Sequence, residues 1–345
     1  MKALQYVGPE KVEVRDVPVV PPAPGQAKIR ITYCGVCGSD IGIYSGKHPR
    51  AKAPLTIGHE FVGVIEEINE VVGRTDLHVG DRVAAYPLIS CGHCYACRTG
   101  KDYICQTLRL IGIDLDGGMA EYVNCDVNSL YKIPDDVPGK VAAVIEPLAV
   151  AVHAVRRSGF KPLDSTAIIG AGPIGILVGL VLKESGASRI IISDISEGRL
   201  ALCKEFGFET INSSKESLAD YVAKTTGGEG VNIVYECSGV AAAASEMTYP
   251  VCADGMICLV GVHKEPRSVV LSDMHFRELN MTATRVYEKE EFGQTVKYIE
   301  KLKDDIEKVV TDVFPLEKSE NVFEYIADAS NGAMKVVIEC SKEEK

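Results

Sequence analysis

The stretch of sequence that decides the fold is residues 165–194, which read STAIIGAGPIGILVGLVLKESGASRIIISD. A short apolar run is followed by a turn with three glycines, an uncharged helical run and a second apolar run that ends at Asp194. A GxGxxG turn alone is a weak signal, but this one follows a predicted strand and opens a predicted helix, as dinucleotide binding requires. These residues therefore predict a parallel βαβ unit that binds a dinucleotide.

The three glycines of this turn have separate predicted roles. Gly170 permits the tight turn, Gly172 lets the backbone approach a pyrophosphate, and Gly175 lets the helix pack against the strand. Pro173 and Ile174 open the helix, where the missing N–H of the proline is not needed. The helix N-terminus offers unpaired N–H groups to phosphates. The competing interpretation of these glycines is a turn that serves packing alone.

Asp194 lies about 20 residues after the glycines, at the place of the acidic residue that binds ribose hydroxyls. A carboxylate here accepts hydrogen bonds from the ribose of NAD and repels the additional phosphate of NADP, so we predict a preference for NAD. Arg199 could reach the same edge and counts against that preference. Asp194 could instead cap the next helix, although Ser196 is also available as a cap.

Short apolar runs and helical patterns continue to alternate as far as residue 286. The predicted strands are residues 166–170, 189–193, 231–236, 256–260 and 281–286, and the predicted helices are residues 173–183, 197–206, 218–224 and 241–248. This alternation predicts an α/β fold, with a parallel sheet that is covered by helices on both faces.

The segments before and after this alternation show different residue patterns. β-branched runs predict a β-rich first third, with strands at residues 27–33, 60–68, 82–85 and 120–123. Residues 41–54 show no periodicity and are predicted to be a loop, whereas residues 141–158 have helical spacing. The C-terminal part predicts helices at residues 290–302 and 319–329 and a strand at residues 335–338.

Composition and charge narrow the class of protein. The chain has 345 residues, a length typical of about two domains, and its 46% hydrophobic and 25% charged residues are ordinary for a globular protein. The formal net charge of −11 disfavours nucleic acid and anionic membranes as partners. We expect no secretory signal, because residues 1–8 show no basic start followed by an apolar run. We also expect no membrane span, because a glycine-rich turn interrupts the uncharged residues 165–182.

Four of the twelve cysteines form a tight cluster, Cys91, Cys94, Cys97 and Cys105. Four thiolates on one short loop can surround zinc tetrahedrally, and a site closed in this way is structural. Redox chemistry and chance clustering are the alternatives. The other cysteines are dispersed among apolar residues, a pattern that indicates a reducing compartment and hence a cytoplasmic protein.

Cys37, His59 and Glu146 form a second, weaker set of metal-ligand candidates. Cys37 lies in a turn after a predicted strand, His59 stands at the entrance of another, and Glu146 is a charged residue in an apolar helical stretch. A buried carboxylate needs a partner, and a metal ion is an adequate one. Taken singly, each residue fits a structural role better than a ligand role. His153, on the same stretch as Glu146, is predicted to be a core or interface histidine.

Together these motifs resemble the zinc-containing medium-chain dehydrogenase/reductase superfamily, and the resemblance covers nearly the whole chain. It rests on GHE at residues 58–60, CGSD at residues 37–40, the four-cysteine loop and the GAGPIG turn. The chain is most similar to the polyol/sorbitol, threonine and sugar-acid dehydrogenase branch. The segment IEPL at residues 145–148 supports that branch, since other alcohol dehydrogenases have a cysteine ligand there.

The resemblance implies a discontinuous catalytic domain. A GroES-like β-barrel would comprise residues 1–149 and 286–345, and a Rossmann domain with a doubly wound parallel sheet would comprise residues 150–285. The active site would lie in the cleft between them. Members of this family form homo-oligomers, so the resemblance also implies a dimer or a homotetramer.

The resemblance assigns roles to individual residues. Cys37, His59 and Glu146 would bind a catalytic zinc, with Glu60 as a fourth or exchangeable ligand, so each chain would hold two zinc ions. Ser39 would pass the substrate proton onward. Val260, Gly261 and Val262 would touch the nicotinamide through backbone groups. Thr284 and Arg285 would lie near the cofactor and the domain junction.

One position departs from the family pattern. Many relatives have a histidine, the outer proton relay, two residues after Asp40, and in this chain that position is Gly42. Tyr44 matches an aromatic residue of threonine-dehydrogenase-like members and is a candidate catalytic residue. His48 or bulk water is the candidate for the exit of the proton.

The implied function is the NAD-linked, zinc-dependent oxidation of a secondary alcohol to a ketone. Zinc would act as a Lewis acid on the substrate oxygen, and the hydride would pass to the nicotinamide. A polyol, sugar alcohol or sugar acid is the first choice of substrate, and L-threonine or a 2,3-butanediol-type diol is the alternative. Arg285 could hold a substrate carboxylate or merely line the cofactor cleft. The rival from another class is a non-catalytic, cofactor-binding protein.

Overall fold

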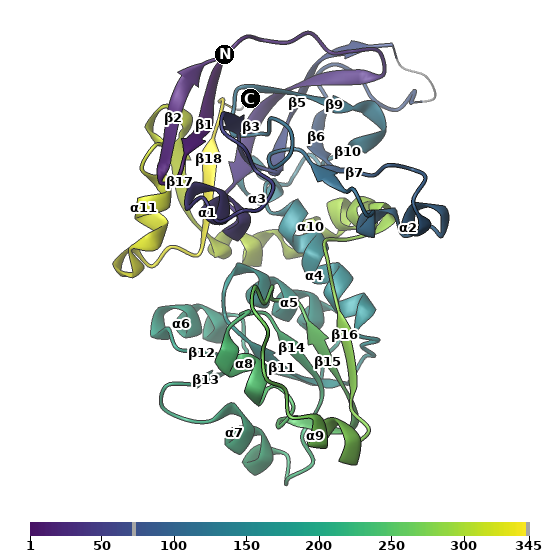
Figure 1. Ribbon diagram of the computed structural model, residues 1–345, viewed down its shortest axis with the longest axis vertical. Coiled ribbons are helices and arrows are strands. Elements are labelled where there is room, and N and C mark those ends of the chain that lie inside the picture. The colour runs from purple at the N-terminus through teal and green to yellow at the C-terminus, as the bar shows by residue number, and fades with distance from the viewer. Residues whose placement is uncertain (71–73, 343–345) are drawn as a thin grey trace. The chain divides into compact units, whose positions relative to one another are not determined.

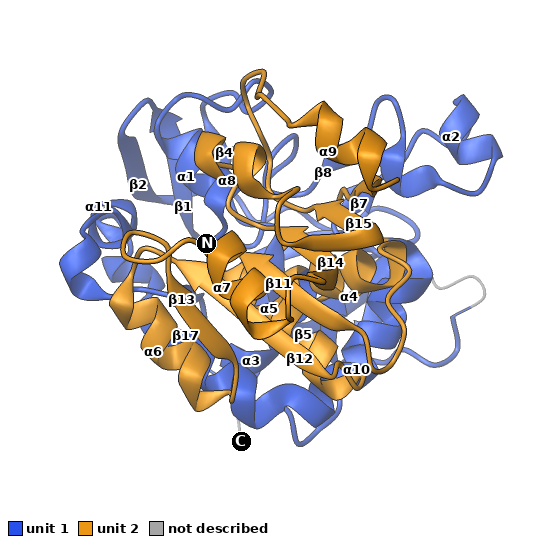
Figure 2. Ribbon diagram, turned by 90° about the horizontal axis from the view of Figure 1, so that it is seen from below, with its two compact units in different colours: residues 1–146, 288–345 blue, residues 147–287 orange. Residues whose placement is uncertain are grey.

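The structure is a computed structural model that describes residues 1–70 and 74–342. The chain divides into two compact units (Figure 2). The first comprises Met1–Glu146 and Glu288–Lys345, and the second comprises Pro147–Tyr287. The sequence predicts the domain boundaries after residues 149 and 285, a few residues from these changes of unit, and the role of each domain remains a prediction.

The second unit is built around a parallel sheet of six strands in the order β13-β12-β11-β14-β15-β16 (Figure 1). These strands are β11 (Ser165–Ile169), β12 (Arg189–Asp194), β13 (Glu209–Asn212), β14 (Val231–Glu236), β15 (Val251–Leu259) and β16 (Asn280–Ala283). Every neighbouring pair is parallel. The strand order reverses between β11 and β14, and ligands of open α/β sheets bind at such a point, outside the carboxyl ends of the strands.

Helices alternate with these strands along the chain. They are α4 (Ile145–Arg157), α5 (Pro173–Glu184), α6 (Glu197–Glu205), α7 (Leu218–Thr225), α8 (Ala241–Glu246) and α9 (Leu271–Phe276). The central strands are largely apolar because both faces of the sheet are buried, as Ala167 and Ile191 show on one face and Ile168 and Ile192 on the other. The prediction of an α/β unit with a parallel sheet is confirmed.

The first unit is built mainly from antiparallel strands. Its largest sheet has seven strands, in the order β10-β6-β5-β3-β18-β17 with β9 also paired to β3. They are β3 (Gln26–Gly35), β5 (Glu60–Asn69), β6 (Arg82–Ala85), β9 (Tyr122–Asp126), β10 (Leu130–Lys132), β17 (Val310–Pro315) and β18 (Lys335–Glu339). Since β18 pairs antiparallel with β3, the C-terminal segment completes a sheet that the N-terminal segment begins.

Two smaller sheets hold the other strands found among the described residues of this unit. They are β2-β1-β4, made of β1 (Lys2–Gly8), β2 (Lys11–Asp16) and β4 (Leu55–Thr56), and β7-β8, made of β7 (Leu88–Ile89) and β8 (Arg109–Leu110).

Helices in the first unit are short, with one exception. They are α1 (Gly38–Tyr44), α2 (Tyr95–Arg98), α3 (Gly139–Ala142), α10 (Lys289–Val309) and α11 (Val322–Ala327), with 3-10 turns at Asp102–Ile104, Val127–Ser129, Leu316–Lys318 and Ala329–Asn331. The long helix α10 buries one apolar stripe, which includes Phe292, Val296 and Ile299, and leaves its charged face exposed. Across the described residues, no helix is both long and apolar enough to cross a membrane.

Three predicted elements differ from the structure. Residues 41–44, predicted as part of a loop, belong to α1, where two glycines within seven residues conceal the helical pattern. The predicted helix 141–158 is divided into α3 and α4. The predicted helix 319–329 is limited to Val322–Ala327, because a 3-10 turn replaces its C-terminal end.

We expect Gly179→Ala to destabilise the second unit by about 1–3 kcal/mol, because its Cβ would lie 2.7 Å from the ring of buried Phe208. Gly198→Ala is the matched control, since this exposed helical glycine has only Ser196 Oγ within 4.0 Å of a Cβ. The control should stabilise the unit by about 0.5–1 kcal/mol. Urea unfolding of both variants measures the difference, and equal stabilities would contradict the packing described.

Candidate active site

The pairing of three strands brings distant residues of the first unit together. β3 pairs with β5 so that Gly35 lies opposite Glu60, and it pairs on its other edge with β18 so that Gly35 also lies opposite Val337. Cys37 stands at the start of α1, just after β3, and His59 immediately precedes β5. The possible ligand atoms of Cys37, His59 and Glu60 consequently all lie within 4.8 Å of one another.

Two glycines permit this close approach. A Cβ atom on Gly35 would lie 2.1 Å from Glu60 Oε2. Gly58 has a φ of +98°, and a Cβ atom there would lie 2.6 Å from Cys34 Sγ. Neither position can accept a larger residue without displacing its neighbours. The glycine of the GHE motif therefore makes the turn that delivers His59 to the cluster.

Polar atoms around this cluster are buried without hydrogen bonds. Asp40 Oδ1 and His59 Nδ1 are 3.8 Å apart and form no hydrogen bond, and Ser39 Oγ is likewise buried and unpaired. Each such group costs about 1–3 kcal/mol when it stays unsatisfied. A thiolate, an imidazole and a carboxylate are the donors of zinc sites, and a substrate hydroxyl would satisfy the serine. The residues present therefore fit a zinc ion and a small polar ligand.

The charges in the cluster also favour a cation. Burial lowers the pKa of the His59 imidazole, but the charges of Cys37, Asp40 and Glu146 and a hydrogen bond with Cys37 outweigh burial and raise that pKa well above its usual value. Burial raises the pKa of the Asp40 carboxyl, and the opposing effect of His59 is smaller. The acidic groups of the cluster thus outnumber its two cationic groups, His59 and Lys335.

Glu146, the third predicted ligand of this metal, is the second residue of α4 and is 7% exposed. Its charge raises the pKa of His59 and of Lys335, so it lies within electrostatic range of both. In the described part of the chain, the group of converging ligand atoms contains Glu60 and not Glu146. The ligand role of Glu146 remains a prediction.

Lys335 is a site residue that the sequence patterns did not reveal. It begins β18 and is 3% exposed, and its Nζ donates to Glu60 Oε2 and, at 3.0 Å, to the carbonyl oxygen of Val36. The lysine and the glutamate are 275 residues apart in sequence. The sequence does show a lysine as the first residue of an apolar strand, which is an unusual position for a charged side chain. That Glu60 is its partner follows only from the strand register.

The residues predicted for proton transfer lie on α1 and in the loop after it. Tyr44 stacks on Phe323 with ring centroids 4.8 Å apart, and burial raises the pKa of its hydroxyl. His48 Nδ1 accepts two backbone N–H groups, at 3.3 and 3.2 Å, which hold the loop. A Cβ atom on Gly42 would meet nothing within 4 Å, so space does not explain the missing histidine. The stacking accounts for Tyr44 structurally, and its catalytic role remains a prediction.

The four cysteines of the predicted structural site converge at the start of α2. The Sγ–Sγ distance is 3.4 Å between Cys94 and Cys97, and 3.9 Å for both Cys91–Cys97 and Cys94–Cys105. Backbone N–H groups of His93 and Cys94 lower the pKa of Cys91 to about 6, which favours the thiolate. Four sulfurs at these separations fit a closed zinc site.

In the second unit, the glycine turn has the backbone geometry that a dinucleotide site needs. Gly170 has a φ of +104°, and a Cβ atom on Gly175 would lie 1.9 Å from the Gly170 carbonyl oxygen. A Cβ atom on Gly172 would meet nothing within 4 Å, so that side of the turn is open. Gly172 is the N-cap residue of α5 and supplies no side-chain cap, so the first N–H groups of the helix are available to a phosphate.

Asp194 uses both carboxylate oxygens to shape this turn. Oδ2 accepts the N–H of Ala171 at 2.8 Å, and Oδ1 accepts the N–H of Ser196 at 2.9 Å. Ser196 itself caps α6 by accepting the N–H of Arg199, so the interpretation of Asp194 as the helix cap is wrong. Each carboxylate oxygen retains a second lone pair for a ribose hydroxyl. Arg199 Nη1 lies 4.0 Å from Asp194 Oδ2.

A cavity of about 450 Å³ opens at the carboxyl ends of the strands beside this turn. Predicted cofactor residues and the loop after β14 contribute to its lining, which includes Gly170, Gly172, Asp194, Arg199, Cys237 and Ser238. The other predicted cofactor residues begin α5 or follow β15 and β16, outside this lining as far as the structure describes it: Pro173, Ile174, Gly175, Val260, Gly261, Val262, Thr284 and Arg285. The cavity coincides with the reversal of strand order, where a ligand of an open α/β sheet is expected.

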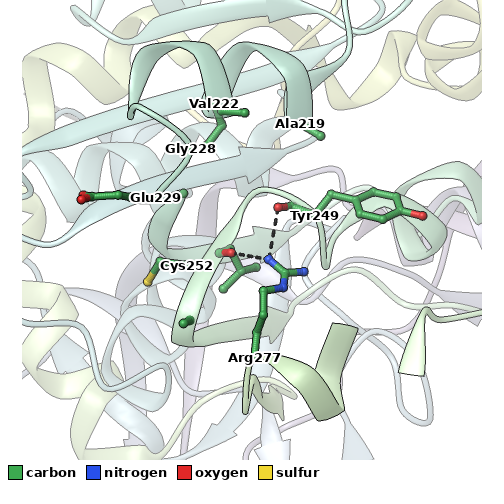
Figure 3. A pocket seen from close by; sticks show the side chains of 11 residues that line it. Ala219, Val222, Gly228, Glu229, Tyr249, Cys252 and Arg277 are labelled. Atoms are coloured by element: carbon green, nitrogen blue, oxygen red, sulfur yellow. Dashed lines mark hydrogen bonds between the residues drawn. The ribbon is translucent and has the colours of Figure 1, made fainter. Parts of the chain in front are cut away.

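A second cavity of about 520 Å³ lies at the opposite, amino ends of β14 and β15 (Figure 3). Arg277 is its one strong donor in the described lining, and it donates to the carbonyl oxygens of Thr248, Tyr249 and Val251 at 2.7, 3.4 and 2.6 Å. Arg277 is also paired with Asp273 at 3.0 Å. The guanidinium is therefore committed to the protein and is not free to recognise a ligand in this cavity.

Comparisons with known proteins show the family of this chain. Residues 23–135 match the family "Alcohol dehydrogenase GroES-like domain", and residues 173–301 match the family "Zinc-binding dehydrogenase". The 2-dehydro-3-deoxy-L-galactonate 5-dehydrogenase of Pseudoalteromonas atlantica is 34% identical over 345 residues, 100% of both chains. The chain belongs to the zinc-binding alcohol dehydrogenase family.

Solved structures share the whole fold of this zinc-binding dehydrogenase. The 2R,3R-butanediol dehydrogenase of Bacillus subtilis has a TM-score of 0.90 at 27% identity and covers 98% of this chain and 99% of its own. A putative zinc-binding dehydrogenase of Sinorhizobium meliloti 1021, bound to NADP, has a TM-score of 0.91 at 30% identity and covers 98% of both chains. The predicted superfamily, the GroES-like and Rossmann fold class and the zinc-dependent, dinucleotide-linked oxidoreductase class are confirmed.

We expect Lys335→Met to destabilise this dehydrogenase by about 3–5 kcal/mol, because it leaves the Glu60 carboxylate buried without its ammonium partner. Lys28→Met is the matched control, since Lys28 pairs with Glu67 at 2.7 Å near the surface, where such a pair contributes about 0–1 kcal/mol. Chemical unfolding of both variants measures the losses. Equal losses of unfolding free energy in the two variants would show that burial of the pair of Lys335 and Glu60 does not add to its contribution to stability.

Proposed function

We propose that this protein oxidises a secondary hydroxyl of a polyol, sugar alcohol or sugar acid to a ketone with NAD. The observation that carries the proposal is the convergence of Cys37, His59 and Glu60 within 4.8 Å beside the unsatisfied hydroxyl of Ser39. Such a donor set holds zinc while leaving room for a ligand, in contrast to the closed four-cysteine site. We assign the zinc sites to the first unit and the coenzyme to the second.

Different residues of the proposed site bind the zinc ion and transfer the proton. Cys37, His59 and Glu146 hold the catalytic ion, and Glu60 is an exchangeable ligand whose carboxylate Lys335 keeps in place. Zinc in this site supplies a Lewis acid for the substrate hydroxyl, and NAD supplies the hydride acceptor. Ser39 Oγ, which has no partner of its own, accepts the proton of the substrate hydroxyl and passes it towards solvent. Tyr44 lies along the same helix.

The substrate class follows from the branch of the family and from the relatives. A sugar-acid dehydrogenase matches the chain over its full length, and a butanediol dehydrogenase shares its fold. Both names describe oxidation of a hydroxyl within a chain that carries other oxygen atoms. A diol or L-threonine is therefore the second candidate, and Arg285 is the residue proposed to meet a substrate carboxylate.

A screen of NAD reduction with polyols, aldonic acids, diols and L-threonine tests this function, together with zinc analysis of variants. We expect two zinc ions per chain, activity with a polyol or sugar acid, and complete loss of activity with retained folding in Cys37→Ala. Cys94→Ala should lose the other zinc and mainly lower stability. Cys252→Ala, in a half-buried cysteine of the second unit, is the control that should keep both ions. An active Cys37→Ala variant that lacks metal would refute the catalytic assignment.

Preference for NAD over NADP is a separate expectation, since a structural relative was solved with NADP. The Asp194 carboxylate beside the cavity should repel the 2′-phosphate, so kcat/KM should favour NAD by about a hundredfold. Asp194→Asn removes the charge and should narrow that ratio. Comparable kcat/KM values for the two coenzymes in the unmodified enzyme would defeat the expectation.

We also propose a cytoplasmic homo-oligomer. None of the twelve cysteines forms a disulfide, as is usual in a reducing compartment. β16 is an edge strand of the parallel sheet, and exposed apolar side chains lie on it and on the preceding α9: Leu271, Phe276 and Met281. An edge strand with apolar neighbours can pair with a second copy of the chain. Light scattering of Met281→Lys and of the unmodified protein tests this interface, and an unmodified protein that is monomeric would exclude it.

A further inference from the structure

Glu236 is a buried carboxylate for which the proposed reaction has no use. It is the last residue of β14 and is 0% exposed. It stands at the carboxyl end of the sheet, the same end at which the dinucleotide cavity opens. A fully buried charge is retained only where several hydrogen bonds compensate it, so its partners indicate what it does.

One oxygen of this carboxylate organises the loop that follows β14. Oε1 accepts the backbone N–H groups of Ser238 and Gly239, both at 2.8 Å, and the hydroxyl of Ser238. The same loop contributes Cys237, Ser238 and Val240 to the lining of the cavity. The shape of that part of the wall therefore depends on the Glu236 carboxylate.

The other carboxylate oxygen of Glu236 and its main-chain carbonyl oxygen hold the loop that follows β15. Oε2 accepts a hydrogen bond from His263 Nε2 at 2.9 Å, and the main-chain carbonyl oxygen accepts the N–H groups of Val260 and Gly261 at 2.8 and 2.7 Å. One residue thus joins the two loops at the carboxyl ends of adjacent parallel strands. All the bonded atoms belong to the second unit.

The two loops are packed against each other without free space. A Cβ atom on Gly261 would lie 2.4 Å from the backbone nitrogen of Gly239 and 2.7 Å from Glu236 Oε2. Gly239 has a φ of +67°, and a Cβ atom there would lie 2.9 Å from the carbonyl oxygen of Val262. A change in the position of one loop is therefore transmitted directly to the other.

His263, in the loop after β15, provides the side-chain contact between this loop and Glu236. Its side chain is 16% exposed, and its Nδ1 atom is buried without a hydrogen bond. The bond from Nε2 to Glu236 is consequently the polar contact that orients the ring. With four donors on its two oxygens, Glu236 has little capacity left for a ligand, and it acts through the loops that it holds.

We propose that Glu236 and His263 are positioning residues that clamp the two loops in the conformation that binds the nicotinamide coenzyme. This inference rests on the proposed function, because it takes the cavity at these strand ends to be the coenzyme site. The clamp raises affinity by holding the loops in the bound form before the coenzyme arrives, so that binding does not have to order them.

Two amide variants of His263 test the clamp. The amide nitrogen of glutamine is as many bonds from Cα as histidine Nε2, so His263→Gln keeps the donor to Glu236. His263→Asn places its amide at the level of Nδ1 and loses that donor. His275→Asn is the control, because His275 is an exposed histidine on α9 of the same unit. Coenzyme affinity is measured as the Kd of the zinc-loaded protein for NADH by fluorescence, with thermal unfolding as the measure of folding.

We expect His263→Asn to raise the Kd for NADH about tenfold, as the loss of one charge-assisted hydrogen bond implies. His263→Gln and His275→Asn should stay within about threefold of the unmodified protein. The KM for NAD should follow Kd, while the KM for the alcohol stays unchanged. A purely structural role would lower the unfolding temperature of His263→Asn without this pattern in Kd.

The outcomes separate the two proposals. If the unmodified protein binds NADH and His263→Asn binds it equally well, the clamp is refuted and the proposed function stands. Equal weakening in His263→Asn and His263→Gln also refutes it, because the donor to Glu236 would then not matter. If the unmodified protein does not bind NADH, the proposed function fails, and the clamp fails with it.

Discussion

The buried pair of Lys335 and Glu60 is the interaction on which the candidate active site depends. Both side chains are at most 3% exposed, and they come from strands that flank β3 on its two edges. An ammonium in the protein interior is stable only if a carboxylate meets it, so the pair requires the C-terminal strand to dock against the N-terminal one. The pairing of β3 with β5 places Cys37 and His59 around Glu60, and the docking of β18 adds the ammonium that meets the Glu60 carboxylate. The metal cluster and its buried ion pair therefore depend on the same closed sheet.

The two zinc-type clusters differ in how the chain assembles them. Cys91, Cys94, Cys97 and Cys105 lie on one loop and need little more than local folding to converge. The other cluster needs three strands in register and glycines at positions 35 and 58. Its surplus of acidic groups and its unpaired atoms leave it incomplete without a cation and a ligand. A zinc ion with four protein ligands stabilises the fold, whereas a zinc ion with an open position can bind and activate a substrate. This contrast underlies the structural and catalytic roles that we propose for the two clusters.

The features that the sequence could predict are those whose physical cause is local. The GAGPIG turn needs its glycines within six residues, and the four-cysteine loop carries all its ligands, so both were readable from spacing. The partner of Lys335 lies 275 residues away and follows only from the sheet register. The pattern of residues does not predict the helix at Gly38–Tyr44, because its two glycines conceal the periodicity and the contact between Cys37 and Asp40 that caps it is polar. The sequence predicts Glu236 only as the end of a strand, because the four hydrogen bonds to its carboxylate come from loops whose positions the sequence does not give.

X-ray absorption at the zinc edge of the purified protein tests the central claim most directly. If each chain holds one closed sulfur site and one site of thiolate, imidazole and carboxylate, the spectrum should show an average of about 2.5 sulfur ligands per zinc, at about 2.3 Å, with the remaining ligands nitrogen or oxygen. Metal analysis of the same sample should give two zinc ions per chain. A spectrum with four sulfur ligands per zinc and a single ion per chain would contradict the account, because the cluster around Glu60 would then hold no metal.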